Sequence, residues 1–508
     1  MKNVIEVPVL DYNLDPRGAG HFFYNHMDKH KNNIAQVEVK TGNIDTYGDL
    51  LKRCVRASVY LKKIGLQPGD FISVCTYNHL NACVPMIAAF FINAIMSALD
   101  PTLSLEDMVH LLQQIKPKVV FTTPESVTMI ESVIKRIGTD TAVIVFGSTS
   151  SHVSFSDALA TCTKNEILNF SPTSVRTLDD IGIVYFSSGT TGLAKTLCHT
   201  HYSIICQSTN NAESGFNFGL TFGYYSPYWT VYSQCLCTSI IMGTARLLLP
   251  KFDKSNPWEP FYHKPKVDVS FVKDIFIAGG VIDSDQVKNL QNLFVDSEIY
   301  RLYGQSEVLG YLAHFTPKDK ELKALKPDSV GLGIPGVSYK IVDVDSRLAL
   351  GPHKRGELCV KTKFAMTGYY NMDSSDTWDT DGWLRTGDIG YYDEDNCFYI
   401  VDRIKEMFKY QGWHVTPSSI ENVLLQHPAV GLAVALGVPH KIDGHHPMGV
   451  VVLKHEHSNT TANEILKFAD AKLEDRLKLR AGLKIVQTLP LTGSGKIHRR
   501  KLKESLGL

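Results

Sequence analysis

The sequence predicts an α/β protein with a large N-terminal domain of layered sheets and helices and a small α+β C-terminal domain. The first observation is length, because 508 residues exceed what one compact core usually contains. The second is the alternation of short apolar runs with helical patterns from residue 47 to residue 350, which predicts buried sheets between helices. The third is a change after Ile400 to charged and then amphipathic sequence. We therefore expect an N-terminal domain over residues 1–402 and a C-terminal domain over residues 403–508.

The N-terminal domain begins with a helical pattern and continues with strands. Apolar residues in the stretch 46–65 recur about every 3.6 residues, and Thr46 is a residue type that caps helices. The apolar stretch 82–99 contains Pro85 and Asn93, so it predicts a buried helix and strand rather than a membrane span. Further short apolar runs predict strands at residues 70–76, 118–123, 142–147, 274–280 and 298–304.

The C-terminal domain is predicted from a different order of patterns. An amphipathic stretch precedes two strand-like runs, at residues 431–438 and 448–455. A basic helix is expected from Thr461 to Arg480. Helices and strands in this order predict a small α+β unit.

The composition excludes a broad charged surface. Lysine plus arginine and aspartate plus glutamate each number 52, so any phosphate site must be local and no net field attracts nucleic acid. The first ten residues lack a basic start and a long apolar core, so we expect no signal peptide. The 10 cysteines show no C-x-x-C spacing, which favours reduced thiols in a cytosol-like compartment.

A strand-like run at residues 181–186 leads into a loop rich in small polar residues. The sequence from Tyr185 to His201 reads YFSSGTTGLAKTLCHTH, and it offers many N–H and O–H donors with little bulk, which suits phosphate oxygens. Lys195 adds a positive charge on a flexible stem. A solvated surface turn is the alternative, but the preceding strand and the lysine favour phosphate. The spacing of glycine and lysine in this loop is not that of an NTPase P-loop. A second glycine–lysine loop, LTGSGKIH at residues 491–498, does not have the P-loop spacing either.

Taken together, the motifs resemble one family. The chain contains, in order, SSGTTGLAK (187–195), YGQSE (303–307), GELCVK (356–361), MTGYYN (366–371), the long stretch from GWLRTGD to PSSIE (382–421) and PLTGSGKIHRRKL (490–502). This series resembles the adenylate-forming superfamily, which contains acyl-CoA synthetases, 4-coumarate–CoA ligases, beetle luciferases and the adenylation domains of peptide synthetases. The resemblance runs from about Tyr47 to Leu502. In their detailed sequence the motifs are nearest to the luciferase and coumarate-ligase branch.

The resemblance implies a reaction in which a carboxylate oxygen attacks the α-phosphate of ATP, giving an acyl-adenylate and pyrophosphate. Charge builds on the phosphoryl oxygens in the transition state, so cations and hydrogen-bond donors held in place carry most of the catalysis. The implied cofactors are ATP, Mg²⁺ and CoA, with O₂ in place of CoA for a luciferase. The resemblance places the ATP phosphates against Ser187, Ser188, Gly189, Thr190, Thr191, Gly192 and Lys195.

Further nucleotide contacts follow from the same resemblance. Ser306 would contact the α-phosphate, and Glu307 would help to hold Mg²⁺. Asp388 would accept hydrogen bonds from the ribose hydroxyls, with Arg403 at the ribose or phosphate. The segments that flank the adenine correspond to Gly279, Gly280, Tyr303 and Gly304. Packing and turn geometry are the alternative roles for that segment, and a surface ion pair is the alternative for Arg403 and its neighbour Asp402.

The small domain is mobile in the family, and the resemblance gives it the reactive lysine. Lys496 would bridge the attacking carboxylate and the α-phosphate as the catalytic lysine of adenylation. Lys405 lies at the hinge. Lys409 and Gly412 lie on the face presented for the second half-reaction, so one mobile domain would serve two steps. A solvated basic tail is the alternative for the residues that follow Lys496.

The acid pocket departs from the family pattern. Trp229 stands where the aromatic motif of the family commonly has a histidine. After YGQSE, where the family often has small residues along the acyl pocket, Gly310 is small but Tyr311 is large. These residues predict a shortened or reshaped pocket for a compact acid. The alternative is that both rings pack elsewhere.

We therefore expect an ATP-dependent carboxylate-activating enzyme that then forms a thioester with CoA. A luciferase, an amino-acid-adenylating enzyme and a non-catalytic relative remain alternatives. The expected partner is a small-molecule carboxylic acid, without nucleic acid or stable membrane insertion, and no carrier attachment site of the G-G-x-S type follows Lys496. The terminal Leu506-Gly507-Leu508 lacks the basic middle residue of a peroxisomal S-K-L tripeptide, which favours the cytoplasm over the peroxisome.

Overall fold

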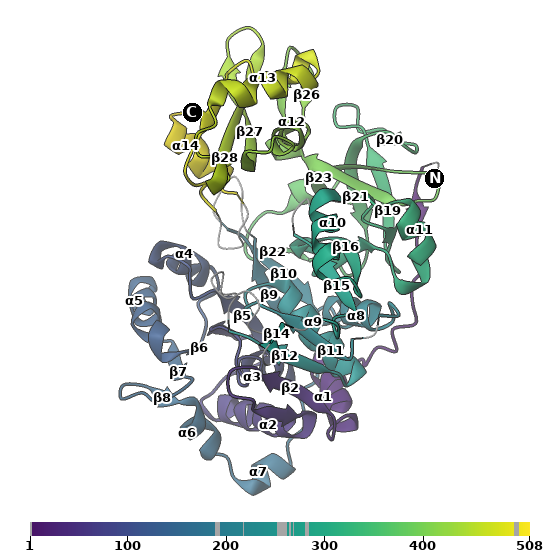
Figure 1. The fold of residues 1–508 in the computed structure, drawn as a ribbon. Coiled ribbons are helices and arrows are strands. Elements are labelled where there is room, and N and C mark those ends of the chain that lie inside the picture. The colour runs from purple at the N-terminus through teal and green to yellow at the C-terminus, as the bar shows by residue number, and fades with distance from the viewer. Residues whose placement is uncertain are drawn as a thin grey trace.

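The predicted α/β architecture with a smaller C-terminal domain is confirmed. The computed structural model describes residues 3–187, 194–216, 218–250, 262–263, 266–267, 269–279, 284–491 and 497–508. Figure 1 shows the elements from β26 to α14 gathered at one end of the molecule, while the elements labelled from α1 to β23 form the larger part.

A long sheet forms the centre of the large domain. Within the described residues its strand order is β22-β10-β9-β5-β4-β6-β7-β8, parallel from β9 to β8 and antiparallel at β10 and β22. The strands predicted at 70–76, 118–123 and 142–147 are present in this sheet. Its members are β4 (Phe71–Cys75), β5 (Ile95–Leu99), β6 (Val119–Thr122), β7 (Ala142–Val145), β8 (Val153–Ser154), β9 (Ile181–Phe186), β10 (Thr196–Thr200) and β22 (Gly368–Tyr369).

Helices cover both faces of this sheet. Ile72 and Val74 of β4 pack into a cluster with α2 (Tyr47–Lys63) and α3 (Val84–Ile92). Their neighbours Phe71 and Cys75 pack on the other face with α4 (Leu105–Ile115) and α5 (Val127–Ile137). Apolar residues therefore fill both sides of the parallel strands, as such strands require. The ends of the strands are left to carry polar chemistry.

The start of α2 confirms the predicted cap. The Thr46 hydroxyl accepts a hydrogen bond from the Asp49 N–H at 3.1 Å, and the Asp49 carboxylate accepts one from the Thr46 N–H at 3.3 Å. Such a reciprocal capping box satisfies two N–H groups that the first turn leaves free. A cap of this kind contributes about 1 kcal/mol.

Further sheets complete the large domain. Among the described residues, one has the order β1-β19-β21-β23-β24, with β20 beside β19, and others have the orders β15-β16-β17-β18, β11-β12-β2-β3 and β13-β14. The predicted strands at 274–280 and 298–304 are present as β15 and β16. The bounds are β1 (Ile5–Glu6), β2 (Ile34–Glu38), β3 (Ile44–Thr46), β11 (Leu220–Gly223), β12 (Ala245–Leu248), β13 (Tyr262–His263), β14 (Lys266–Val267), β15 (Asp274–Ile277), β16 (Glu298–Gln305), β17 (Gly310–His314), β18 (Leu332–Gly333), β19 (Ser338–Val342), β20 (Ala349–Leu350), β21 (Gly356–Lys361), β23 (Leu384–Tyr392) and β24 (Phe398–Arg403).

One histidine is fixed at the start of a buried helix. The remaining helices of the large domain are α1 (Ala19–Lys29), α6 (Phe155–Ala160), α7 (Lys164–Leu168), α8 (His201–Ala212), α9 (Thr230–Met242), α10 (Ser284–Leu293) and α11 (Lys320–Leu325). Nδ1 of the buried His201 accepts a hydrogen bond from the Ala19 N–H at 3.2 Å, and Nε2 lies 3.2 Å from the Asn93 Oδ1. These partners fit a neutral ring that donates through Nε2. Burial lowers the pKa of His201 to about 4.

The C-terminal domain has its own sheet and core. Its sheet has the order β26-β25-β28-β27, with β29 beside β28. Ala433 and Ala435 of β27 face one apolar cluster, whereas Val434 and Leu436 face another. The elements are β25 (Phe408–Tyr410), β26 (Trp413–Val415), α12 (Pro417–Leu425), β27 (Val430–His440), β28 (Gly444–Leu453), α13 (Ala462–Lys472), β29 (Leu483–Ile485) and α14 (Arg499–Leu506).

The helix expected from Thr461 to Arg480 is shorter than predicted. Thr461 caps its start, but the α-helix ends at Lys472. Leu473 is extended (ψ 137°), and Leu473 and Leu479 both turn into the core of the small domain. Apolar anchoring outside the helical pattern therefore ends the helix early.

Two bulk properties complete the description. Within the part of the chain that the structure describes, no helix is both long and apolar enough to cross a membrane. The 10 cysteines are all free thiols, as their spacing predicted.

Candidate active site

The predicted phosphate loop connects two antiparallel strands. Phe186 of β9 pairs with Thr196 of β10, and the loop between them is closed by Ser187 and Lys195. The Ser187 N–H donates to the Lys195 carbonyl at 2.8 Å, and the Ser187 hydroxyl accepts from the Lys195 N–H at 2.9 Å. The loop therefore has a fixed base, and no helix follows it directly. Several predicted phosphate ligands lie outside the described residues, namely Ser188, Gly189, Thr190, Thr191 and Gly192.

Lys195 is oriented by an aromatic ring that the sequence did not single out. Its Nζ lies 4.5 Å from the centre of the Tyr369 ring, a cation–π contact. Tyr369 belongs to β22, where it pairs with Leu197 two residues after the lysine. Burial and the negative charge of Glu307 both raise the pKa of Tyr369. Tyr369 thus lies near the loop lysine and near the predicted metal ligand.

The YGQSE motif forms a strand end followed by a tight turn. Ser306 and Glu307 lie in a single 3₁₀ turn, Ser306–Val308, directly after β16. The Glu307 carbonyl accepts a hydrogen bond from the Met366 N–H at 2.7 Å, which joins this turn to the MTGYYN segment. The two motifs therefore meet in space, with the Glu307 side chain half-buried.

Asp388 is buried at the centre of a polar cluster whose cation, Arg403, is exposed to solvent. Its Oδ2 accepts hydrogen bonds from the Tyr303 hydroxyl at 2.8 Å and from the Gln305 Nε2 at 2.5 Å. Its Oδ1 lies 3.1 Å from the Nε of Arg403, its partner across strands β23 and β24. Gln305 also donates to the Thr386 carbonyl at 2.9 Å. Hydrogen bonds to a carboxylate are stronger than neutral ones, so this cluster holds the carboxylate in one orientation.

The pKa values of Tyr303 and Arg403 are both raised in this cluster. Burial, followed by the nearby Asp388 charge, raises the pKa of Tyr303 well above its usual value, so the phenol remains a neutral donor. Burial alone would lower the pKa of Arg403, but the charges of Asp388 and Glu307 outweigh it and raise that pKa. Arg403 therefore stays a cation between two carboxylates.

Gly304 is required by the close approach of β16 and β17. A Cβ on Gly304 would lie 2.2 Å from the Gly310 carbonyl oxygen, and the strand register shifts between Tyr303 and Gly304. No other residue fits here without moving a strand. Gly304 therefore lets β16 and β17 pack closely just before Gln305, which contacts Asp388. Ser306 and Glu307 follow in the next turn.

The three predicted acid-pocket residues contact different parts of the core. Trp229 precedes α9, contacts Tyr228 edge-on at 4.9 Å between ring centres, and packs against the cluster on the α4 and α5 side of the central sheet. Tyr311 packs against the cluster around Phe216. The Cα of Gly310 faces the buried amides of α8 and α9, since a Cβ there would lie 3.5 Å from the side chains of Gln207 and Gln234. Their role as substrate contacts stays a prediction.

The connection between the domains is held from both sides. Arg403 ends β24, and Lys405 lies exposed in the short turn Ile404–Glu406. The Asp402 carboxylate accepts a hydrogen bond from the Ser418 N–H at the start of α12, at 2.9 Å. The Ser418 hydroxyl donates to the Val401 carbonyl at 3.0 Å. Two adjacent residues just before the predicted hinge residue Lys405 are therefore bonded to different domains. Arg403 contacts Asp388 of the large domain, and Asp402 accepts a hydrogen bond from Ser418 of the small domain.

The remaining predicted residues are Lys409, Gly412, Gly279, Gly280 and Lys496. Lys409 of β25 is exposed and lies 3.6 Å from the Asp345 carboxylate of the large domain. Gly412 has a φ of 81° in the β25–β26 turn, and Gly279 has a φ of 88° just after β15. Gly280 and Lys496 lie outside the described residues.

The structure thus brings Lys195, Glu307, Asp388 and Arg403 into one region through shared neighbours. It adds Gln305 and Tyr369, which sequence reasoning missed. Gln305 could have been found from strand periodicity, because it lies two residues after Tyr303 and shares its face. Tyr369 lies within a recognised motif, but only the pairing of β22 with β10 shows that it contacts Lys195.

Comparison with known proteins identifies the family of the chain. The profile of the family described as "AMP-binding enzyme" matches residues 23–265 and 255–370, and that of the "AMP-binding enzyme C-terminal domain" matches residues 419–496. The chain is 27% identical to "Luciferin 4-monooxygenase" of Nipponoluciola cruciata, over 99% of this chain and 97% of the relative. It is 28% identical to "Probable 4-coumarate--CoA ligase 1" of Dictyostelium discoideum, over 87% of each chain.

A solved structure is also similar to this chain. The luciferase-like enzyme from the nonluminescent mealworm Zophobas morio has 31% sequence identity and a TM-score of 0.75, covering 80% of this chain and all of that one. Matching family profiles cover more than half of the sequence. The chain therefore belongs to the AMP-binding enzyme family, the adenylate-forming superfamily that its motifs resemble.

Proposed function

We propose that this protein is an acid–CoA ligase that activates a compact carboxylic acid with ATP and transfers the acyl group to the thiol of CoA. Family membership supports activation of the acid as an adenylate, and the CoA step is our extension of it. The observation that carries the proposal is the cluster of Asp388, Tyr303, Gln305 and Arg403 beside Glu307. A buried carboxylate held by two donors and a cation is suited to recognise a nucleotide ribose.

The residues present fit a nucleotide. Oδ2 of Asp388 is engaged by two donors, whereas Oδ1 faces Arg403 and keeps lone pairs for a ribose hydroxyl. Arg403 and Lys195 supply the positive charge that phosphate oxygens require. Glu307 offers a hard oxygen ligand of the type that Mg²⁺ prefers, and the metal would neutralise charge on the phosphates.

The second part of the proposal assigns the small domain. Lys496 is the cation for the attacking carboxylate and α-phosphate, and Lys405 is the hinge residue. Lys409 and Gly412 belong to the face for the CoA step. Lys409 is exposed and lies 3.6 Å from the carboxylate of the exposed Asp345, so breaking this ion pair costs little free energy.

A panel assay tests the function directly. The protein would be incubated with ATP, Mg²⁺ and each of a set of short, aromatic and long-chain acids, with and without CoA. Pyrophosphate release and loss of free CoA thiol would be followed. We expect pyrophosphate release with compact acids and thiol loss in equal amount. Release without thiol loss for every acid would contradict the CoA step, and no release would contradict acid activation.

A luciferase is the second candidate, because several similar proteins are luciferin 4-monooxygenases. The same assay separates it when light and O₂ consumption are recorded with luciferin as the acid. Light emission with O₂ uptake, and no thiol loss, would favour this candidate over the ligase.

A further inference from the structure

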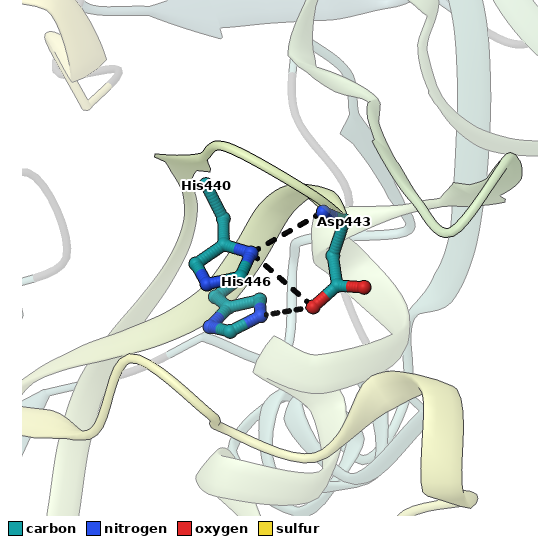
Figure 2. A group of neighbouring side chains, drawn as sticks. All are labelled: His440, Asp443 and His446. Carbon is teal, nitrogen blue, oxygen red and sulfur yellow. Dashed lines mark hydrogen bonds and ion pairs between the residues drawn. The ribbon is translucent and has the colours of Figure 1, made fainter.

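Two histidines and an aspartate converge at the turn between β27 and β28. Figure 2 shows the carboxylate of Asp443 facing the rings of His440 and His446. Its Oδ2 lies 2.8 Å from the His446 Nε2 and 3.2 Å from the His440 Nδ1. The three possible ligand atoms all lie within 4.8 Å of one another. Asp443 and His446 are half-buried, and His440 lies at the exposed edge of the group. The sequence HKIDGHH places these residues at i, i+3 and i+6.

We propose that His440, Asp443 and His446 bind a divalent transition-metal ion of the zinc class. Zinc is bound by histidine nitrogen and carboxylate oxygen at about 2.0–2.1 Å, so two ligands of a tetrahedral ion lie about 3.4 Å apart. The observed contacts of 2.8 and 3.2 Å are close to that spacing. Two imidazoles in the set favour zinc, copper, nickel or cobalt over Mg²⁺ and Ca²⁺, which prefer oxygen ligands.

The groups converge on one point. Nδ1 of His440 lies 3.2 Å from the Asp443 backbone nitrogen and 3.2 Å from the Asp443 Oδ2, which in turn lies 2.8 Å from the His446 Nε2. The His440 and His446 rings are also stacked, with centres 3.8 Å apart and planes 16° apart. A metal ion shared by the nitrogens and the carboxylate would stabilise this group.

The carboxylate is held by a partner outside the group. The Gln411 Nε2 donates to the Asp443 Oδ1 at 3.0 Å, and the Gln411 N–H donates to the Asp443 carbonyl at 2.8 Å. Gly444, with a φ of 81°, allows the turn to approach β25, because a Cβ there would lie 2.8 Å from the Lys409 carbonyl oxygen. Partners that orient metal ligands typically change metal affinity by about 10–100-fold when removed. The site is thus pre-formed before an ion arrives.

An occupied site would stiffen the turn that carries the second half-reaction. Gln411 lies between Lys409 and Gly412, and its two hydrogen bonds to Asp443 join that turn to the β27–β28 turn. This consequence rests on the proposed function of Lys409 and Gly412. Metal binding itself does not, and the experiment below uses no catalytic readout.

The test is a zinc titration of the full-length protein after removal of metals with a chelator. Calorimetry with ZnCl₂ would be run on the wild type, on Asp443→Asn and on His440→Asn/His446→Asn. The matched control is His455→Asn, which removes an exposed imidazole of the same domain. Circular dichroism would confirm that each variant is folded. Millimolar MgCl₂ would be present throughout, so that hard-cation sites stay filled.

We expect one saturable zinc site in the wild type and the control that is absent from the double variant. Asp443→Asn should bind zinc at least about tenfold more weakly. Hydrogen exchange at the Gln411 amide should slow when zinc is added to the wild type and stay unchanged in the double variant. Equal zinc isotherms for the wild type and the double variant, or no saturable site in the wild type, would overturn the proposal.

Discussion

Removal of one hydroxyl, in Tyr303→Phe, tests whether the Asp388 cluster is a nucleotide site. The hydroxyl donates to the Asp388 Oδ2 at 2.8 Å, and both residues are buried. Phenylalanine keeps the ring and its packing, so the change removes the hydrogen bond and little else. Gln305 and Arg403 remain as partners of the carboxylate.

The expected effects can be worked from this one bond. A hydrogen bond to a charged group contributes about 1.5–3 kcal/mol, so the variant should lose that much unfolding free energy. The carboxylate also becomes free to turn about its remaining donors. If this weakens one ribose hydrogen bond worth about 1–1.4 kcal/mol, the KM for ATP should rise about five- to tenfold. The kcat should change less, because the ribose contact is the same in ground and transition states.

The assay pairs urea unfolding with ATP-dependent pyrophosphate release, and Tyr339→Phe is the matched control. The buried Tyr339 hydroxyl donates to the Leu312 carbonyl at 2.6 Å and accepts from the Ile334 N–H at 2.9 Å, away from Asp388. The control should lose stability without a change in the KM for ATP. Equal KM values for the two variants would refute the assignment of Asp388 to the nucleotide. An unchanged unfolding midpoint in Tyr303→Phe would refute the hydrogen bond.

Further predictions concern the lysines, the acid pocket and a buried histidine. Lys496→Ala should slow pyrophosphate release by about 10²–10³, because it removes a transition-state cation, and a change of only a few-fold would contradict its role. Lys409→Ala should spare that release but slow the reaction of a preformed acyl-adenylate with CoA; equal losses in both steps would count against separate roles. Trp229→Ala and Tyr311→Ala should shift kcat/KM toward longer straight-chain acids, since each CH₂ that fits gains about 0.8 kcal/mol. Unchanged preference in both variants would show that these rings do not bound the acid. Burial lowers the pKa of His201 to about 4, so as the pH falls this ring is protonated in the unfolded chain before it is protonated in the folded one. Stability from the neutral ring is therefore full above about pH 6.5 and is lost as the pH falls toward 4. Urea unfolding from pH 7 to 4.5 should show a shallower loss in His201→Asn, and parallel curves would contradict this.

Local signals in the sequence were sufficient for much of the fold. Thr46 could be predicted as a cap because its partner Asp49 is three residues away, and capping depends only on such neighbours. The same local reasoning failed for the helix expected to reach Arg480, because burial of Leu473 and Leu479 in a distant core decides where it ends. Short-range patterns carry no information about that core.

The site divides in the same way. Asp388 and Arg403 could be assigned through motifs, since their residue types and order are preserved in the chain. Gln305 occupies a variable position of its motif, and Tyr369 reaches Lys195 only through pairing of β22 with β10. Contacts of this kind depend on sheet register, which sequence alone does not give. The His440, Asp443 and His446 group likewise depends on the closure of one hairpin.

Asp402 and Arg403 make the link between the domains a bonded connection rather than a flexible linker. Arg403 is held to the large domain by Asp388, whereas the preceding Asp402 is held to the small domain by the Ser418 N–H. Rotation of the small domain would therefore pull on these two adjacent residues in opposite directions. Rotation must either break the bond at Ser418 or peel the end of β24 away from Asp388. The second route would separate Arg403 from Asp388 as the domain turns. If Asp388 binds the ribose, as proposed, this motion would weaken binding of the nucleotide.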